Sequence, residues 1–291
     1  MNNELYGFSA LPRRPRLELP NGARVALWVG LAVEHYAVDR PGMSIAPHAA
    51  SFVPDPLNAG WRDYGLRVGI WRLADMFERH GLPVTALLNS DVCAAYPEVI
   101  EEGVRRGWAW VAHGHNNNRI HQGMSVDEER AALREMHETI RDATGREPRG
   151  WIGPVLTETF ETPRLLRELG YTYLLDWCSD DQPFPLNVPG GPMISVPYSI
   201  ELNDATMYLG RNLPGPDFEE AIVDQFEVLY EEGAESARVM AIGLHPFIVG
   251  QPFRFKYLER AIARIAGRDD VWFTTSDAIA DWYLSRVEQP A

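Results

Sequence analysis

The sequence contains few cysteines and no long apolar run. Only two of its 291 residues are cysteines, Cys93 and Cys178, and their spacing is not that of a metal site. A disulfide framework is therefore not expected, which suits a protein of the reducing cytoplasm. No stretch of about 18 apolar residues occurs, so no segment is predicted to cross a membrane. The N-terminal residues have no apolar core behind their basic positions, which argues against a secretory signal.

Positive charge is also scarce. Lysine and arginine number 27 against 41 aspartates and glutamates, giving a formal net charge of -14 and a pI near 5.0. Nucleic acids and anionic membranes bind to basic surfaces, so neither is expected as a partner. The same acidity disfavours a strongly anionic substrate. With 45% hydrophobic residues, the chain has the composition of a globular protein that can bury a stable core without disulfide bonds or structural metal ions.

The glycine-rich loop of dinucleotide-binding proteins, Gly-x-Gly-x-x-Gly, follows none of the predicted strands, which argues against a cofactor-dependent oxidoreductase. What the chain does contain is a regular alternation of apolar strands and amphipathic helices. This alternation predicts an α/β fold with a parallel sheet, either closed as a barrel or open and doubly wound. The predicted strands cover residues 24–33, 84–88, 108–112, 172–176, 194–198, 239–245 and 271–275, and one more strand is predicted to begin at Gly150–Trp151. The predicted helices cover residues 65–80, 97–107, 162–170, 217–232, 255–267 and 276–287, with one more opening at Ser125, where Glu128 completes a capping-box pattern.

One segment stands outside this alternation. Residues 40–64 are rich in proline, glycine and alanine and show no hydrophobic period, which predicts a long loop. Loops of this length are usually functional, so we expect it to cover the site or to contact a neighbouring subunit. The whole chain, 1–291, is predicted to form a single catalytic domain with an N-terminal extension over residues 1–23.

Polar side chains gather where the predicted strands end. Glu34 and His35 follow the first strand, His113 follows the strand 108–112 and precedes Asn117, and His245 follows the strand 239–244. In a parallel barrel these carboxyl ends form the active face. Each residue also has a structural alternative, because a histidine can cap a strand and an asparagine run can form a polar turn.

These residue types suit the hydrolysis of an amide. The reaction requires an activated water, stabilisation of an oxyanion and a proton for the leaving nitrogen. A carboxylate can be the base and a separate histidine the acid, and a metal ion held by histidine and carboxylate ligands can activate the water. Glu34, His113 and His245 supply the types required.

In this order, the motifs resemble those of the polysaccharide deacetylase superfamily from about Arg24 to about Trp282. The resemblance is stronger to a cytoplasmic branch with cofactor-independent allantoinases and peptidoglycan-deacetylase-like proteins. It rests on the strand-end pair at 34–35, the histidine motif at 113–117, and the segments GWIGP (150–154), DDQPF (180–184), VPYSIELND (196–204) and LHP (244–246). The resemblance implies a distorted (β/α) barrel with about seven parallel strands.

The resemblance also implies roles for individual residues. Glu34 and His245 are the implied catalytic base and acid. The implied metal positions are His35, His113 and Asn117, with zinc the most suitable divalent ion. Asn117 stands where the family has a second histidine, and an amide oxygen is a poorer ligand, so a metal-independent reaction is the alternative. The implied substrate-binding residues are His115, Trp151, Asp180, Asp181, Asn203 and Asp204.

The sequence therefore predicts a cytoplasmic hydrolase of a non-peptide carbon–nitrogen bond, in a small cyclic or linear amide or in an N-acetyl sugar. It is expected to form a homo-oligomer, a dimer or a tetramer. One alternative is a true polysaccharide or peptidoglycan N-deacetylase, and another is a non-catalytic binding protein on the same barrel.

Overall fold

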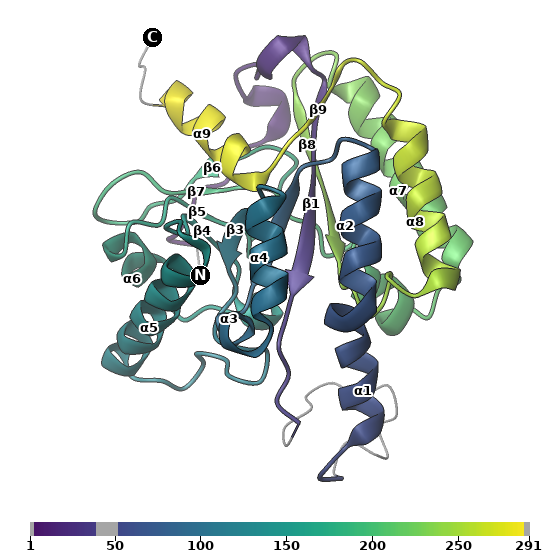
Figure 1. The fold of residues 1–291 in the computed structure, drawn as a ribbon. Helices are drawn as coiled ribbons and strands as arrows, with labels where there is room; N and C mark the ends of the chain where they lie inside the picture. Colours follow the sequence, from purple (N-terminus) through teal and green to yellow (C-terminus); the bar gives the residue numbers. More distant parts are fainter. Residues whose placement is uncertain (1–2, 39–51, 288–291) are drawn as a thin grey trace.

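The computed structural model describes residues 3–38 and 52–287, and within them nine strands form one curled, mostly parallel sheet (Figure 1). The sheet is a half-barrel, which confirms the predicted distorted barrel. Its strand order is β6-β7-β5-β4-β3-β2-β1-β8, with β9 paired to β1. The strands are β1 (Val25–Val33), β2 (Val84–Leu88), β3 (Ala109–Ala112), β4 (Gly150–Trp151), β5 (Tyr173–Leu174), β6 (Phe184–Pro185), β7 (Ile194–Ser195), β8 (Arg238–Leu244) and β9 (Val271–Phe273).

Strand β1 is the centre of the sheet. It pairs in parallel with β8 on one side, and with β2 along its C-terminal half. Strand β9 pairs with the first residues of β1. Every pairing is parallel except that of β6 with β7, so the carboxyl ends of the other strands meet at one end of the half-barrel.

Both faces of the sheet are buried. Successive side chains of a strand point to opposite faces, so alternate residues of β1 from Val25 to Val33 pack under the helices while Trp28 points into the barrel interior. The interior is tightly filled, since a Cβ placed on Gly30 would lie 3.1 Å from the ring of Tyr198. Trp28 donates its indole N–H to the carbonyl of Pro197 across the interior. Burial on both faces explains why the strands read as continuous apolar runs.

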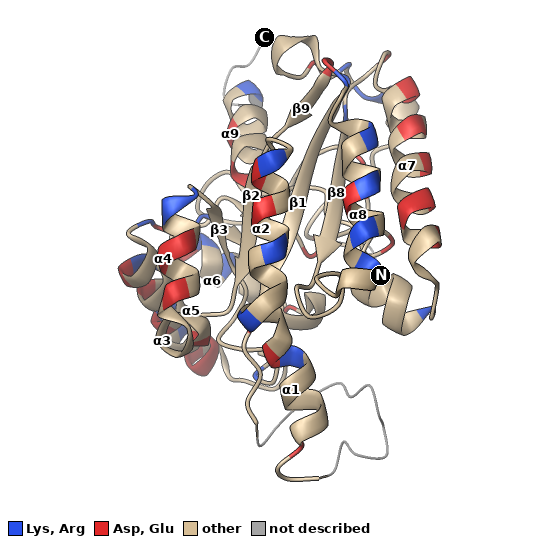
Figure 2. Ribbon diagram, turned by 45° about the vertical axis from the view of Figure 1, so that its right-hand side comes forward, with Lys and Arg blue, Asp and Glu red and all other residues tan. Residues whose placement is uncertain are grey.

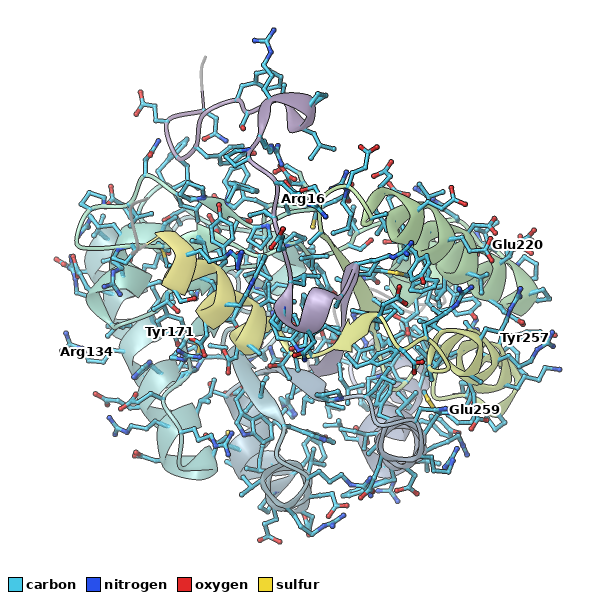
Figure 3. All side chains as sticks on the ribbon, turned by 90° about the horizontal axis from the view of Figure 1, so that it is seen from above. Arg16, Arg134, Tyr171, Glu220, Tyr257 and Glu259 are labelled. Atoms are coloured by element: carbon cyan, nitrogen blue, oxygen red, sulfur yellow. The ribbon has the colours of Figure 1, made fainter. Side chains whose placement is uncertain are left out.

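The helices cover the outside of the curled sheet. In Figure 1, α2 and α4 lie in front of it, α7 and α8 to the right, and α5 and α6 to the left. Figure 3 shows the same layer from above, with Glu220 of α7 and Tyr257 and Glu259 of α8 on the outer surface. The helices are α1 (Pro56–Tyr64), α2 (Ile70–Arg79), α3 (Asp91–Ala95), α4 (Pro97–Arg105), α5 (Val126–Thr144), α6 (Thr162–Glu168), α7 (Gly215–Glu232), α8 (Pro252–Ile265) and α9 (Ser276–Val287), with π-helical turns at Gly65–Gly69 and Ala205–Gly210.

The structure corrects the prediction of a loop over residues 40–64. Residues 56–64 form helix α1, which begins because the carboxylate of Asp55 accepts the N–H of Asn58 and Pro56 occupies the first turn. Residues 40–51 of the predicted loop lie outside the described residues. Two further elements, α3 and the antiparallel strand β6, were also not predicted. The predicted helix at Ser125 is confirmed, with both hydrogen bonds of its capping box present.

The N-terminal segment packs against the end of the half-barrel where the strands begin. Leu17 exchanges backbone hydrogen bonds with the residues before β8, donating to the Ser236 hydroxyl and accepting the Ala237 N–H. Arg14 forms an ion pair with Asp180 at 2.6 Å. Figure 2 shows several Asp and Glu positions, in red, along the ribbons of α4 and α7, which agrees with the negative net charge. In the described part of the chain, no helix combines the length and apolar composition that a membrane span requires.

Candidate active site

The candidate site lies at the carboxyl end of the strands. Glu34, Asn89, His113 and His245 are each the first residue after their strand, β1, β2, β3 and β8. In all four strands the alternation of side chains assigns this position to the barrel interior. The four side chains therefore converge on the mouth of the half-barrel.

Glu34 is at the centre of this group. Its side chain is only 4% exposed, yet three neighbours donate hydrogen bonds to it. Tyr36 donates its hydroxyl to Oε2 at 2.6 Å, and Asn117 donates its amide N–H to Oε1 at 2.7 Å. The Nε2 atoms of His113 and His245 lie 3.2 Å and 3.8 Å from the same Oε1.

These neighbours keep Glu34 ionised. Burial on its own raises the pKa of a carboxyl group. The positive charge of His245 and the hydrogen bonds from His113 and Tyr36 outweigh burial and lower the pKa of Glu34 to about 2. The charge of Glu34 in turn raises the pKa of Tyr36, which is also raised by burial, so Tyr36 stays a hydrogen-bond donor.

His245 is held by a buried aspartate. Asp204 is 0% exposed and precedes the π-helical turn at 205–210. Its Oδ1 lies 2.6 Å from Nδ1 of His245, and its Oδ2 accepts the backbone N–H of His245 at 2.8 Å. Burial lowers the pKa of His245, but the charges of Asp204 and Glu34 outweigh it and raise the pKa to about 9. His245 is therefore an imidazolium near neutral pH, with Nε2–H directed toward Glu34.

Close backbone packing fixes the loop that carries His245. The turn before α2 meets this loop so closely that a Cβ on Gly69 would lie 2.1 Å from the carbonyl oxygen of Pro246. A Cβ on Gly250 would also lie 2.1 Å from this oxygen. Only glycine allows two backbones to approach in this way. Arg72 of α2 adds a hydrogen bond to the carbonyl of Gly250.

His113 has a fixed orientation as well. Its Nδ1 lies 2.8 Å from the carbonyl oxygen of Ile152, which can only accept, so Nδ1 carries a proton. Nε2 then faces Glu34. A hydrogen bond at this second nitrogen requires the doubly protonated ring, because a neutral ring with Nδ1–H has only a lone pair there.

Asn89 fixes the orientation of Asn117. The Asn89 side-chain oxygen accepts the backbone N–H of His35 at 2.9 Å, and its NH₂ group donates to the carbonyl of His113. The same NH₂ group donates to the side-chain oxygen of Asn117 at 3.2 Å. Asn117 must therefore direct its own NH₂ group at Glu34. Reversing that amide would place two NH₂ groups against each other.

The predicted metal set, His35, His113 and Asn117, is not brought together as ligands. Asn117 directs NH₂ rather than oxygen into the site, and Nε2 of His113 lies 3.2 Å from a carboxylate oxygen of Glu34. The His35 ring lies near Tyr96, where α4 begins, and its buried Nδ1 has no partner among the described residues. Residues 3–38 and 52–287 contain no group of three or more His, Cys, Asp or Glu side chains that could hold a metal ion. This donor set does not fit the metal ion that the resemblance implies.

Helix α1 covers one side of the site. The guanidinium of Arg62 lies 3.9 Å from the ring centroid of Tyr36, and burial lowers the pKa of Arg62. Trp61 and Tyr36 both make edge-to-face contacts with Phe247, two residues after His245. A cavity of about 110 Å³ is lined by Glu34, His35, Tyr36, Ala37, Val38, Ala59, Arg62, Asp63, Leu66 and Tyr96. The part of the predicted loop that the structure describes therefore lies at the site.

Two predicted substrate residues face away from this cavity. His115 is buried against α5, with Nδ1 3.0 Å from the Ser90 hydroxyl and Nε2 3.1 Å from the carbonyl of Ala132. Burial lowers its pKa. Trp151 is 0% exposed and belongs to the core between the sheet and the helices, where it stacks on His121.

Asp180 and Asp181 lie at the opposite end of the half-barrel. The carbonyl of Asp181 accepts the N–H of Val239 at the start of β8, whereas His245 follows the end of that strand. At about 3.3 Å per residue, the two positions are roughly 20 Å apart. Substrate binding by this pair is therefore corrected to contacts with the N-terminal segment, since Asp180 pairs with Arg14.

The last two predicted substrate residues, Asn203 and Asp204, contact the residues that form the site. Asn203 donates to the Tyr198 hydroxyl at 3.1 Å and forms a β-bridge with Gly243 of β8. Both carboxylate oxygens of Asp204 form hydrogen bonds with His245 and its loop.

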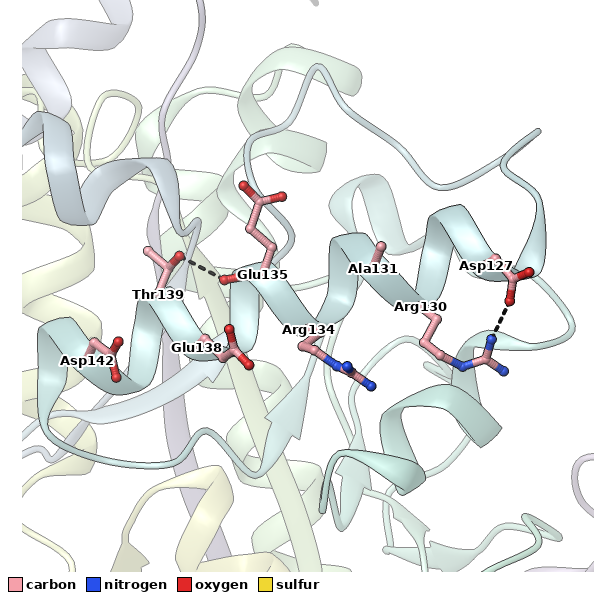
Figure 4. A pocket seen from close by; sticks show the side chains of 8 residues that line it. All are labelled: Asp127, Arg130, Ala131, Arg134, Glu135, Glu138, Thr139 and Asp142. Carbon is pink, nitrogen blue, oxygen red and sulfur yellow. Dashed lines mark hydrogen bonds and ion pairs between the residues drawn. The ribbon is translucent and has the colours of Figure 1, made fainter.

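The shallow depression in Figure 4 is unrelated to these residues. It lies on the solvent face of α5, where side chains such as Arg130 and Asp127 pair with one another.

Sequence reasoning missed three residues of the site. Asn89 had a usable signal, because it follows the strand 84–88 just as His113 follows its own strand. Tyr36 directly follows the strand-end pair at 34–35, and no role was predicted for it. Arg62 had no signal, because its segment was read as a loop.

Comparisons with known proteins show similarity in sequence to polysaccharide deacetylases and in overall structure to an allantoinase. The family model for polysaccharide deacetylase matches residues 62–174. A Schizosaccharomyces pombe protein classed with polysaccharide deacetylases is 29% identical over 241 residues, covering 77% of this chain and 75% of that protein. Helicobacter pylori peptidoglycan deacetylase is 26% identical over 267 residues, covering 80% and 89%. The crystal structure of PuuE allantoinase matches with a TM-score of 0.83 and 29% identity over 96% of both chains.

Proposed function

Because this chain belongs to the polysaccharide deacetylase family of hydrolases acting on carbon–nitrogen bonds, we propose that it cleaves the amide bond of a small non-peptide substrate. The observation that carries the proposal is the pair formed by Glu34 and His245. An ionised carboxylate and an imidazolium lie 3.8 Å apart at the mouth of the half-barrel. A base and an acid placed side by side are what amide hydrolysis requires.

In the proposed reaction Glu34 removes a proton from water while the water oxygen bonds to the amide carbon. The positive charges of His245 and Arg62 near Glu34 stabilise the oxyanion that forms. His245 then donates its Nε2 proton to the nitrogen as the carbon–nitrogen bond breaks. The proton on Glu34 returns to His245 across their short separation, which resets the site.

The two proton transfers support each other. A carboxylate with a pKa of about 2 is a weak base, and the charge of His245 is one reason for the low value. When His245 gives its proton to the leaving nitrogen, that charge disappears. The pKa of Glu34 then rises, and the proton it took from water is held more firmly.

Members of this family often bind a metal ion, but the donor set described above does not fit one. The proposed steps therefore use only side chains of this chain. Dialysis against a chelator is expected to leave turnover unchanged. A loss of turnover that zinc restores would contradict this part of the proposal.

A small substrate is supported by the size of the cavity beside Glu34, about 110 Å³. It is also supported by the similarity to PuuE allantoinase over nearly the whole chain. The second candidate is an N-acetyl sugar, whose acetamido group alone would enter the cavity. The similarity to H. pylori peptidoglycan deacetylase favours it.

The test is a hydrolysis screen with three groups of compounds: cyclic ureides and imides, linear small amides, and N-acetylated amino sugars. Released ammonia, amine, carboxylate or acetate is measured for the wild-type protein and for Glu34→Gln. Turnover of one group that depends on Glu34 supports the proposal and names the substrate class. Tight binding without turnover in all groups would instead favour the non-catalytic alternative.

A further inference from the structure

We infer that Asp176, which lies just beyond β5 and outside the catalytic pair, is a positioning residue that orients His113 through one peptide group. The backbone N–H of Gly153 donates to Oδ1 of Asp176 at 2.7 Å. The carbonyl of Ile152 accepts from Nδ1 of His113 at 2.8 Å. This N–H and this carbonyl belong to the same peptide group, so Asp176 holds one end of it and His113 the other. The inference rests on the proposed function, in which the base is Glu34, the carboxylate that Nε2 of His113 faces.

The peptide group has little freedom to choose another orientation. A Cβ on Gly153 would lie 2.1 Å from the carbonyl oxygen of Thr157, because residues 153–157 form a tight turn. Val155 and Leu156 adopt left-handed backbone angles, with φ of 59° and 52°. Such angles are strained in non-glycine residues and persist only where the surroundings enforce them.

The turn brings Glu158 back to Asp176. Glu158 accepts the indole N–H of Trp177, the residue after Asp176, at 3.3 Å. Oδ2 of Asp176 and Oε1 of Glu158 are buried and have no hydrogen-bond partner among the described residues, apart from a weak contribution of the Trp151 indole to Asp176. A single proton shared between the two carboxyl groups satisfies both oxygens.

Electrostatics support the shared proton. Burial raises the pKa of Asp176 well above its usual range, and the neighbouring charge of Glu158 raises it further. Burial also raises the pKa of Glu158, and the nearby charge of Glu129 acts in the same direction. Cys178, the other titratable group beside Asp176, has a pKa raised to about 11, so it adds no charge near neutral pH. Asp176 is therefore a neutral acid that still accepts from Gly153.

Because Asp176 is a neutral acid, asparagine and leucine at this position separate the effect of its acceptor oxygen from the effect of its volume. Asparagine has the shape of a protonated aspartate and keeps an oxygen for the Gly153 N–H. Leucine has a similar volume but no acceptor. If Asp176 acts by orienting the peptide group, Asp176→Asn should behave as wild type, whereas Asp176→Leu and Asp176→Ala should release the peptide group and loosen His113.

The experiment records the ¹⁵N and ¹H NMR signals of the His113 ring, together with kcat and KM. We expect Asp176→Leu or Asp176→Ala to shift or broaden the His113 Nδ1–H signal and to lower kcat about tenfold to a hundredfold, with KM changed by less than about threefold. Asp277→Asn, at a half-buried carboxylate near the other end of the half-barrel, is the control for general destabilisation.

The inference is overturned if the His113 signal and kcat stay at wild-type values in a folded Asp176→Leu or Asp176→Ala protein. It is also overturned if Asp176→Asn is as damaging as Asp176→Leu, because the shape of the neutral acid would then not be what matters. The leucine variant covers the case in which the alanine variant does not fold. The NMR measurement needs no substrate, so it separates a failure of this inference from a failure of the proposed function.

Discussion

The two ends of the half-barrel hold their carboxylates with different partners. Where the strands begin, the partners are arginines, as in the ion pairs of Arg24 with Asp270 and of Arg238 with Glu232, each at 3.0 Å. Where the strands end, the partners of Glu34 are histidine, tyrosine and asparagine side chains. Both ends place charges beside apolar strands, but with different chemical consequences.

An arginine stays charged at every accessible pH, so its ion pairs cannot pass on a proton. A histidine can gain or lose its proton near neutral pH, and its neighbours decide where it does so. The end with arginines is therefore suited to closing the half-barrel and holding the N-terminal segment. The end with Glu34 and His245 is suited to chemistry, as the active face of parallel barrels generally is.

The largest effect is expected for Glu34→Gln, which keeps the shape of the side chain but removes the base. Turnover of the substrate found in the screen should fall about a thousandfold, within the usual range for general acid–base catalysis. The matched control is Glu232→Gln at the other end, which loses a partner of Arg238 and should keep wild-type turnover. Equal losses of turnover in the two variants would contradict the proposed difference between the two ends of the half-barrel. Both are measured as kcat on folded protein.

The next effect is expected for His245→Ala, which removes the acid and should lower turnover about a hundredfold or more. In the wild-type protein, activity should also fall as pH rises through about 9, because the protonated form of His245 is lost there. The variant should not show this basic limb. A variant with near-normal turnover would show that another group protonates the leaving nitrogen.

The sequence predicted the architecture well because alternation of apolar strands and amphipathic helices is a local signal. It also predicted that Glu34, His113 and His245 lie close together, since strand ends of a parallel sheet share one face. The prediction that Asp180 and Asp181 bind substrate was wrong. The two residues follow β5 closely in sequence, but after β5 the chain runs back to the start of β8, at the other end of the half-barrel. These side-chain directions depend on tertiary contacts that no local pattern encodes.

The same limit explains the metal prediction. The orientation of Asn117 is set by Asn89, which is itself set by backbone groups of two other strand ends. A residue type alone does not reveal whether an amide presents its oxygen or its NH₂ group. Helix α1 was missed for a different reason, because the proline, glycine and alanine content of its segment outweighed the capping signal of Asp55 and Pro56.

An intermediate effect is expected for Asn117→Asp. It replaces the NH₂ donor with an oxygen facing Glu34, and repulsion between the two carboxylates should raise the pKa of Glu34 and lower kcat/KM about tenfold or more. The control is Asn118→Asp, because Asn118 already uses its oxygen to accept the N–H of Ala37, and aspartate can do the same. If Asn117→Asp binds a divalent ion and gains activity, the site has a metal function that we do not propose.

The smallest effect is expected for Arg14→Ala, at the arginine end. The Arg14–Asp180 pair is partly buried, at 18% and 13% exposure, so its loss should cost about 1 kcal/mol of unfolding free energy and leave kcat unchanged. Arg16→Ala is the control, because its 3.9 Å pair with Glu18 is largely exposed and should contribute almost nothing. Thermal melting gives the comparison, and a clear loss of kcat in Arg14→Ala would connect this end to the chemistry.

The central claim is that Asp204 and Glu34 keep His245 protonated as the acid of the site. An NMR titration of the ¹⁵N-labelled His245 ring tests it without any substrate, in the wild-type protein and in Asp204→Asn. We predict a midpoint near pH 9 for the wild type, and a clearly lower midpoint for the variant because the charge of Asp204 is removed. A wild-type midpoint at or below the ordinary histidine value of about 6.5 would contradict the account.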